Sequence, residues 1–241
     1  MRQRIKDNIK YCDSDDNEDR SVIEFLSNLN LNVKYKYIEM GSGLCRFPIK
    51  LSRMFNHLDI ECYEINEKNA QIAVNNGFVT HIGNILQNKI NTESYDIIHC
   101  SHIIEHFKYP DVITFIDEML RIVKTNGYII IRSPLMWGNF FDDIDHIRPY
   151  PPAAIINYLN NPQQQVVGHN KVSIVNIWYR TYPKQVKYVS ENSPIFHTVL
   201  LKNIRNRWVH FINKRLMKMW NKYRWPYASI NGYVMILKKE E

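Results

Sequence analysis

Apolar residues follow two different periods along the first half of the chain. Short apolar runs, typical of strands that are buried on both faces, occur at KYIEM (36–40), LDIECYEI (58–65), FVTHI (78–82), YDIIHC (95–100) and YIIIRSP (128–134). Between these runs apolar residues recur every three or four positions, which predicts helices at residues 19–29, 44–56 and 66–76 and from Pro110 to Asn126-Gly127. Strands that alternate with helices in this way indicate a mostly parallel sheet.

The pattern changes after Pro134. A loop rich in aromatic and charged residues covers positions 135–152, and a short helix is expected at 152–160. Two alternating segments, KVSIVNIWYRTY (171–182) and INGYVMIL (230–237), predict late strands that add to the sheet edge in an antiparallel manner. We therefore expect one α/β domain over residues 1–241. It would hold a Rossmann-like, seven-stranded, mostly parallel sheet with helices on both faces and an antiparallel C-terminal edge.

Composition narrows the class of protein. The chain has 241 residues, of which 45% are hydrophobic, enough for one α/β domain with an appendage. No apolar run reaches the roughly 18 residues of a membrane span, and the first residues lead into no apolar run, so we expect a cytoplasmic protein. Cysteines stand at positions 12, 45, 62 and 100 without Cys-x-x-Cys spacing, which favours reduced thiols and predicts no metal site.

Charge is concentrated late in the chain. The net charge is +7, and no acid occurs between Glu191 and Glu240. On a helical wheel, residues 194–225 place apolar side chains on one face and basic side chains on the other, which predicts a basic amphipathic helical insertion between the last two strands. Such a helix would contact nucleic acid, an anionic membrane or an acidic glycan, or would dock on its own domain.

The first strand runs into a glycine turn in KYKYIEMGSGLCRF (34–47). Gly41 and Gly43 allow a ligand to approach the backbone, but Arg46 stands where a dinucleotide motif needs its third glycine. Glu39 at the strand end would repel a phosphate and suits a cationic group. Glu64 ends the next strand, 23 residues after Gly41, at the distance of an acid that binds ribose hydroxyls. These features favour a phosphate-free adenosine that carries an amino acid, which is S-adenosylmethionine (SAM).

Residues from about Tyr37 to Pro134 resemble the class I SAM-dependent methyltransferases, in the branch of small-molecule and glycan O-methyltransferases. The matching segments occur in the family's order: YIEMGSGLC, CYEIN, HIGNIL, SYDIIHCSHIIEHF and FIDEMLRIVKTNGYIIIRSP. The sequence departs from the family at Cys45, where a further glycine is common, and at Asn84, which replaces an Asp. The resemblance implies this family's fold and SAM as the cofactor.

The same resemblance implies roles for individual residues. The methionine part of SAM would be held by Glu39, Gly41, Ser42, Gly43 and the backbone carbonyl of Cys100. The adenosine part would be held by Glu64, Ile65, Asn84 and Ile85. Within these sets, Glu39 would bind the ammonium group, Glu64 the ribose hydroxyls and Asn84 the adenine amine.

Candidates for the base that an alcohol acceptor requires lie after the fourth and fifth strands. The segment DDIDHIRPYPP (142–152) contains His146, which we predict to be the base, beside Asp145 as its orienting acid. His106 is a further catalytic candidate, and contacts to a hydroxyl-rich substrate are predicted for His102, Arg148 and Tyr150. The alternatives are that His146 and Arg148 only tie the loop down, and that His106 only caps or packs a helix.

The acceptor is inferred by exclusion and by resemblance. Methylation of exocyclic amines usually accompanies an Asn/Asp-Pro-Pro-Tyr/Phe element after the fourth strand, where this chain has CSHI. The basic segment and DHIRPYPP are similar to bacterial-type methyltransferases of surface-polysaccharide pathways. We expect O-methylation of a sugar or surface-glycan precursor, with peripheral contact to an anionic inner membrane face. The alternatives are an RNA methyltransferase, with nucleic acid the less favoured partner, and a SAM-fold binding module without catalysis.

Overall fold

The computed structural model describes residues 9–12, 15–137, 139–160, 168, 172–183, 207–208, 211, 215 and 228–241. The chain forms two compact units, Met1–Arg180 with Asn231–Glu241, and Thr181–Ile230. The first unit contains the elements that build the site. The predicted basic helix at 194–225 lies in the second unit and, apart from residues 207, 208, 211 and 215, outside the described residues.

The sheet has eight strands in the order β1-β7-β8-β6-β5-β2-β3-β4. Their bounds are β1 (Ile9–Cys12), β2 (Tyr35–Met40), β3 (Leu58–Glu64), β4 (Val79–Ile82), β5 (Tyr95–Ser101), β6 (Val123–Pro134), β7 (Val172–Pro183) and β8 (Ala228–Lys239). Strands β2 to β6 pair in parallel, whereas β8 is antiparallel to β6. This confirms the predicted fold class. The extra strand β1 pairs in parallel with β7, and its four residues are too few to show a period.

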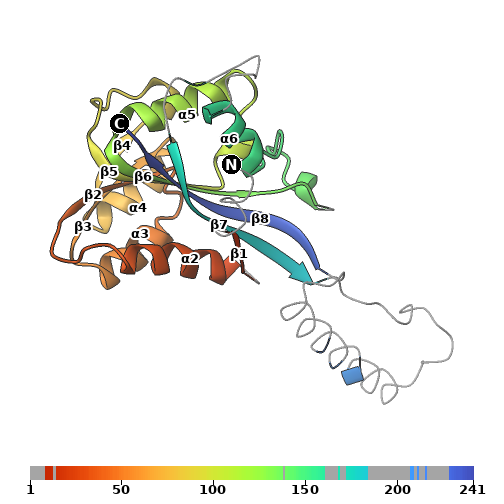
Figure 1. The fold of residues 1–241 in the computed structure, drawn as a ribbon. Coiled ribbons are helices and arrows are strands. Elements are labelled where there is room, and N and C mark those ends of the chain that lie inside the picture. The colour runs from red at the N-terminus through yellow and green to blue at the C-terminus, as the bar shows by residue number, and fades with distance from the viewer. Residues whose placement is uncertain are drawn as a thin grey trace. The chain divides into compact units, whose positions relative to one another are not determined.

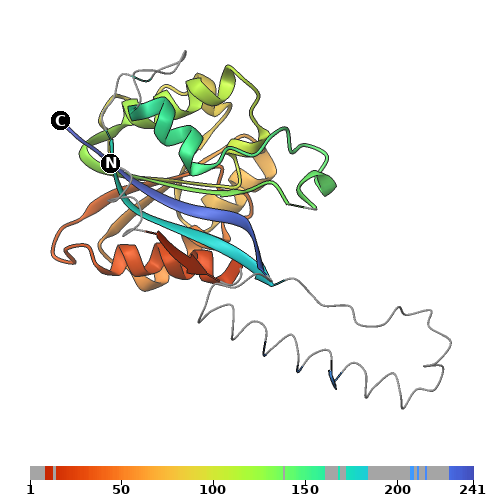
Figure 2. The same ribbon diagram turned by 45° about the vertical axis from the view of Figure 1, so that its right-hand side comes forward.

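Helices cover both faces of this sheet (Figure 1). The helices are α2 (Asp15–Ser27), α3 (Arg46–Met54), α4 (Glu67–Asn75), α5 (Asp111–Ile122) and α6 (Pro152–Asn160), with 3₁₀ turns η1 (Ile85–Gln87), η2 (Ile104–His106) and η3 (Phe140–Asp142). Helices α2 and α3 lie on one side of the sheet and α5 and α6 on the other (Figure 2). Within the described part of the chain, no helix is long and apolar enough to cross a bilayer.

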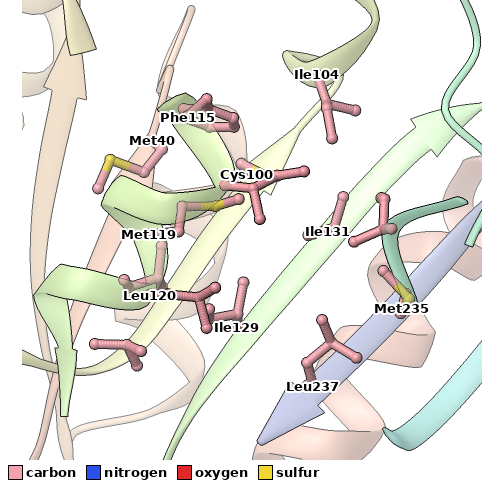
Figure 3. Packing of buried hydrophobic residues seen from close by; sticks show 14 of the residues in the cluster. Met40, Cys100, Ile104, Phe115, Met119, Leu120, Ile129, Ile131, Met235 and Leu237 are labelled. Atoms are coloured by element: carbon pink, nitrogen blue, oxygen red, sulfur yellow. The ribbon is translucent and has the colours of Figure 1, made fainter. Parts of the chain in front are cut away.

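Two hydrophobic clusters follow from the alternation of side chains along the strands. In β6, Ile129 and Ile131 face α5 and α6, whereas Ile130 faces α2 and α3. Figure 3 shows the first cluster, where Phe115 and Met119 of α5 pack over the strands. The neighbouring strands β2 to β6 are thereby held firmly, and their carboxyl ends meet at one edge.

The end of α5 differs from the sequence prediction. The helix stops at Ile122, and Val123 already pairs with Tyr95 of β5. Asn126 has a positive φ of 66°, and a Cβ on Gly127 would come within 2.8 Å of the Asp96 carbonyl oxygen, so this turn lies within β6. The apolar period could not reveal the boundary, because Val123 is buried in either conformation.

Three of the four cysteines lie in the described part of the chain. Cys45, Cys62 and Cys100 are free thiols and buried. Burial raises the pKa of the Cys100 thiol well above its usual value, and the carboxylates of Glu105 and Glu39 add to that effect. Cys100 therefore acts as a small apolar core residue.

Candidate functional site

A cavity of about 430 Å³ lies at the carboxyl ends of the parallel strands β2, β3, β4 and β5. Its walls are Gly41, Gly43, Tyr63, Glu64, Ile65, Asn69, Gly83, Asn84, Ile85, Ser101, His102, Ile103, His106 and Phe107. Most of the residues predicted to bind the cofactor thus surround one space. Two of the predicted acceptor-side histidines share it.

The glycine loop after β2 forms one wall of the cavity. Gly41 has a φ of +73° and Gly43 a φ of +50°, a backbone region that favours glycine. A Cβ on Gly41 would also collide with the side chain of Ile103, which follows β5. Any residue other than glycine at position 41 would therefore require the side chain of Ile103 to move.

Glu64 joins two walls of the cavity. Its Oε2 accepts a hydrogen bond from the backbone N–H of Gly43 over 2.6 Å, and its Oε1 accepts one from the N–H of Asn66 over 2.9 Å. The side chain is buried, yet it lines the cavity. Each carboxylate oxygen has a further lone pair, so Glu64 can still accept hydrogen bonds from a ligand's vicinal hydroxyls.

Glu39 is more deeply enclosed than the sequence suggested. Its Oε2 accepts hydrogen bonds from the Tyr37 hydroxyl over 2.6 Å and from His99 Nδ1 over 2.8 Å. Burial raises the pKa of Tyr37 well above its usual value, and the charge on Glu39 adds to this. Glu39 is absent from the cavity wall, so contact with a ligand ammonium would need Oε1 or a bridging water. Sequence reasoning missed His99, which the β2–β5 register places opposite Glu39.

The remaining predicted cofactor residues fall into different positions. Asn84 lines the cavity, and its side-chain carbonyl accepts a hydrogen bond from the N–H of Leu86 over 3.0 Å, which caps η1. Ser42 is buried in the glycine loop between Gly41 and Gly43, and its side chain is not part of the cavity wall. The side chain of Cys100 lies in the core, and the next residue, Ser101, lines the cavity. The contact of the Cys100 backbone carbonyl with SAM stays a prediction.

His102 lies between two buried carboxylates. Its Nδ1 is 3.3 Å from Glu105 Oε1 and its Nε2 is 3.5 Å from Glu18 Oε2. Burial by itself would lower the pKa of His102, but the hydrogen bonds to Glu105 and Glu18 and their charges outweigh it and raise the pKa to about 9. At neutral pH His102 is an imidazolium, so it can hold an acceptor but cannot serve as the base.

Glu18, from α2, also faces two buried arginines. Arg132 Nη2 and Arg180 Nη1 each lie 3.4 Å from its carboxylate. Burial raises the pKa of Glu18, but His102 and these arginines outweigh burial and lower it below its usual value. The sequence did not indicate a role for Glu18, because Glu18 lies in an acidic segment that is typical of the solvated start of a helix.

His106 and His146 form a pair of histidines at the cavity. The ring centroids of His106 and His146 are 5.0 Å apart, although the two residues are 40 positions apart in the chain. His106 lines the cavity, and its Nδ1 lies 3.1 Å from the carbonyl oxygen of Asp145 and 3.4 Å from the Asp145 carboxylate. Asp145 is thus the partner of His106, whereas the sequence had paired it with its neighbour His146.

The predicted substrate residues Arg148 and Tyr150 do not line the cavity. Tyr150 is buried, its hydroxyl donates to the carbonyl of Phe107 over 2.8 Å, and its own carbonyl accepts from Tyr233 over 2.7 Å. The Arg148 guanidinium lies 5.6 Å from the centroid of the Tyr150 ring. Tyr150 therefore anchors the acceptor-side loop, which holds His146 in place.

Comparisons with known proteins found one matching family and several similar solved structures. The model of a methyltransferase-domain family matches residues 1–220. No curated protein matches the sequence. A SAM-dependent methyltransferase from Archaeoglobus fulgidus is similar in structure, with a TM-score of 0.59 and 16% identity over 94% of this chain and 95% of that chain. The YcgJ protein from Bacillus subtilis has a TM-score of 0.56 and 11% identity over 93% of this chain and 99% of that chain.

A third similar structure contains a ligand. Phosphoethanolamine N-methyltransferase 2 from Haemonchus contortus, in complex with SAM, has a TM-score of 0.51 and 13% identity over 93% of this chain and 53% of that chain. At such identities the likeness to solved structures shows a shared fold.

Proposed function

Because this chain belongs to the methyltransferase-domain family and is a SAM-dependent methyltransferase, we propose that it O-methylates a sugar or a surface-glycan precursor in the cytoplasm. The cofactor is SAM. The observation that carries the choice of acceptor is the histidine pair beside the cavity. An alcohol must lose a proton to become methylated, and His106 and His146 are well placed to assist that loss.

The residues of the cavity fit SAM better than a dinucleotide. Neither lysine nor arginine occurs among the residues that line it in the described part of the chain, so the two charges of a pyrophosphate would meet only the single positive charge of His102 there. Glu64 offers acceptors for ribose hydroxyls, and the glycine loop forms the wall where the methionine part would lie. The exposed side chain of Ile65 is available to cover an adenine ring.

When bound, SAM supplies an activated methyl group on its sulfonium. The chain must then hold the acceptor oxygen in line with that methyl group, which accounts for much of the rate of such reactions. His102 presents a positive charge at the wall of the cavity and would bind an oxygen-rich acceptor. His106 lies on the same wall and would receive the hydroxyl proton directly or through His146.

The positive charge of the chain favours either a second acceptor or a location at a membrane. The net charge of +7 and the basic residues 194–225 would suit the phosphates of RNA or the headgroups of an anionic membrane. In the first case the enzyme would methylate RNA. In the second the enzyme would stay at the inner membrane face, where a lipid-linked glycan precursor would meet it.

A methyl-transfer assay tests the proposal. The full chain would be incubated with SAM that is labelled on the methyl group, and with nucleotide sugars, oligosaccharides or RNA. We expect label in a sugar and a product that resists mild alkali, because an ether is stable where an ester is not. The Glu64→Ala variant controls for carry-over of contaminating enzymes. Two outcomes would refute the assignment: label that appears in RNA alone, and the absence of label from every nucleotide sugar and oligosaccharide.

A further inference from the structure

We propose that Glu105, His106 and His146 bind a divalent first-row transition-metal cation beside the SAM cavity. One potential ligand atom from each of the three side chains lies within 4.8 Å of the others. Metal–ligand bonds of about 2.0–2.2 Å place neighbouring ligand atoms roughly 3–3.5 Å apart, so small side-chain movements would complete the site. No spacing in the sequence predicted it, because the histidines come from separate segments.

Both histidines are held in a tautomer that leaves the lone pair on Nε2 for a metal. His146 Nδ1 lies 2.7 Å from the carbonyl oxygen of Phe140, and His106 Nδ1 lies 3.1 Å from that of Asp145. A carbonyl oxygen can only accept, so each Nδ1 carries a proton, and in the neutral ring Nε2 carries the lone pair. Metal-binding histidines in proteins are usually oriented by such a contact. The two rings are therefore prepared to donate Nε2 to a cation.

Glu105 is the third ligand, and its neighbours hold it in a fixed position. The side chain is fully buried. Oε2 accepts a hydrogen bond from Ser133 over 3.1 Å, and His102 lies 3.3 Å from Oε1. These neighbours fix the direction of the carboxylate. Each carboxylate oxygen keeps a further lone pair, with which Glu105 could bind a cation.

The donor set indicates which cation. Two imidazole nitrogens and one carboxylate oxygen suit Zn²⁺, Mn²⁺, Fe²⁺ or Co²⁺, whereas Mg²⁺ and Ca²⁺ prefer oxygen ligands alone. Three protein ligands leave coordination positions for water or a substrate oxygen. Asp143 stands nearby, with its Oδ2 3.8 Å from His146 Nε2, and could supply a fourth ligand.

The catalytic role of the cation rests on the proposed function, whereas the binding itself does not. His106 also lines the cavity, so a bound cation would lie at the boundary between SAM and the acceptor. A cation that binds the acceptor hydroxyl lowers the pKa of that hydroxyl and orients its oxygen. The proton would then leave to solvent or to Asp143, and the histidines would act as ligands in place of the base.

A cobalt titration tests the site without any acceptor. The full chain would be stripped with a chelator, dialysed and titrated with Co²⁺ while its visible absorption is recorded, and then competed with Zn²⁺. We expect one equivalent of Co²⁺ to bind with a d–d spectrum of mixed nitrogen and oxygen ligands. His106→Ala, His146→Ala and Glu105→Gln should each weaken binding about tenfold or more.

His81→Ala is the matched control. His81 Nε2 contacts a carboxylate, that of Glu61, over 2.8 Å, but it lies on β4 outside the cluster, so its removal should leave the titration unchanged. Thermal unfolding of each variant checks that the fold is retained. The proposal fails if the stripped wild-type chain binds neither Co²⁺ nor Zn²⁺, or if folded His106→Ala and His146→Ala variants bind as the wild type does. The cobalt titration uses no acceptor, so a negative acceptor screen would not change its result. Failure of the metal site and failure of the proposed function can therefore be distinguished.

Discussion

The carboxylate of Glu64 accepts a hydrogen bond from the backbone N–H of Gly43 across 2.6 Å, and this contact joins the end of β3 to the glycine loop after β2. The acid and the loop are therefore one unit. The contact orders the loop and directs the carboxylate toward the cavity. Loss of the Glu64 carboxylate should therefore weaken cofactor binding in two ways, by removing a ligand contact and by loosening the loop.

Replacing Glu64 by alanine should weaken SAM binding by about an order of magnitude or more, because two ribose hydroxyls would lose their acceptor. Isothermal titration with SAM measures this. Glu67→Ala, at the exposed start of α4, serves as a control for the loss of one acid. Equal affinities of wild type and Glu64→Ala would remove the ribose assignment.

Gly41→Ala should lower the free energy of unfolding more than Gly77→Ala. Both glycines have positive φ, so both variants bear a left-handed conformation that costs about 1–2 kcal/mol. Only at Gly41 does the new methyl group also collide with Ile103, whereas nothing lies within 4 Å of a Cβ at Gly77. Urea unfolding measures the difference, and Ile103→Ala should recover the excess in the Gly41→Ala background. Equal losses in the two variants would show that the close approach is not maintained in solution.

His146→Ala should reduce turnover by about 10²–10⁴-fold and leave SAM affinity intact, because His146 lies beyond the cofactor walls of the cavity. The same loss is expected whether His146 is a base or a metal ligand, and the cobalt titration separates these roles. Turnover is measured on the acceptor that the screen identifies. Full activity of the variant would reduce His146 to a residue that ties the loop.

Glu61 should stabilise the protein at neutral pH but not in acid. Burial raises its pKa, but hydrogen bonds from Tyr95, Lys36 and His81 outweigh this and lower the pKa below its usual value. A carboxyl group whose pKa is lower in the folded chain adds stability above its unfolded pKa, and this is lost as the pH falls through the folded value. Glu61→Gln should thus be less stable than wild type at about pH 7, with the gap shrinking towards about pH 3. Urea unfolding across this range measures it, and a gap that is constant with pH would contradict the assignment.

The sequence by itself determined which segments form the parallel strands and where the cofactor loop lies. Buried strands show as apolar runs, and in a parallel sheet the residues after such runs meet at one edge. Gly41, Gly43, Glu64 and Asn84 each lie at the end of a strand or within three residues after it, so local pattern was enough to place them at one cavity.

Only the tertiary structure decided which distant residues meet. Glu39 finds His99 through the register of β2 and β5, Glu18 reaches His102 from α2, and His106 meets His146 across a loop that Tyr150 anchors. No periodic pattern in the sequence indicates these pairs, because each depends on the packing of elements that are far apart in the chain. The chemistry of the acceptor side is built from such pairs, so it emerges with the fold.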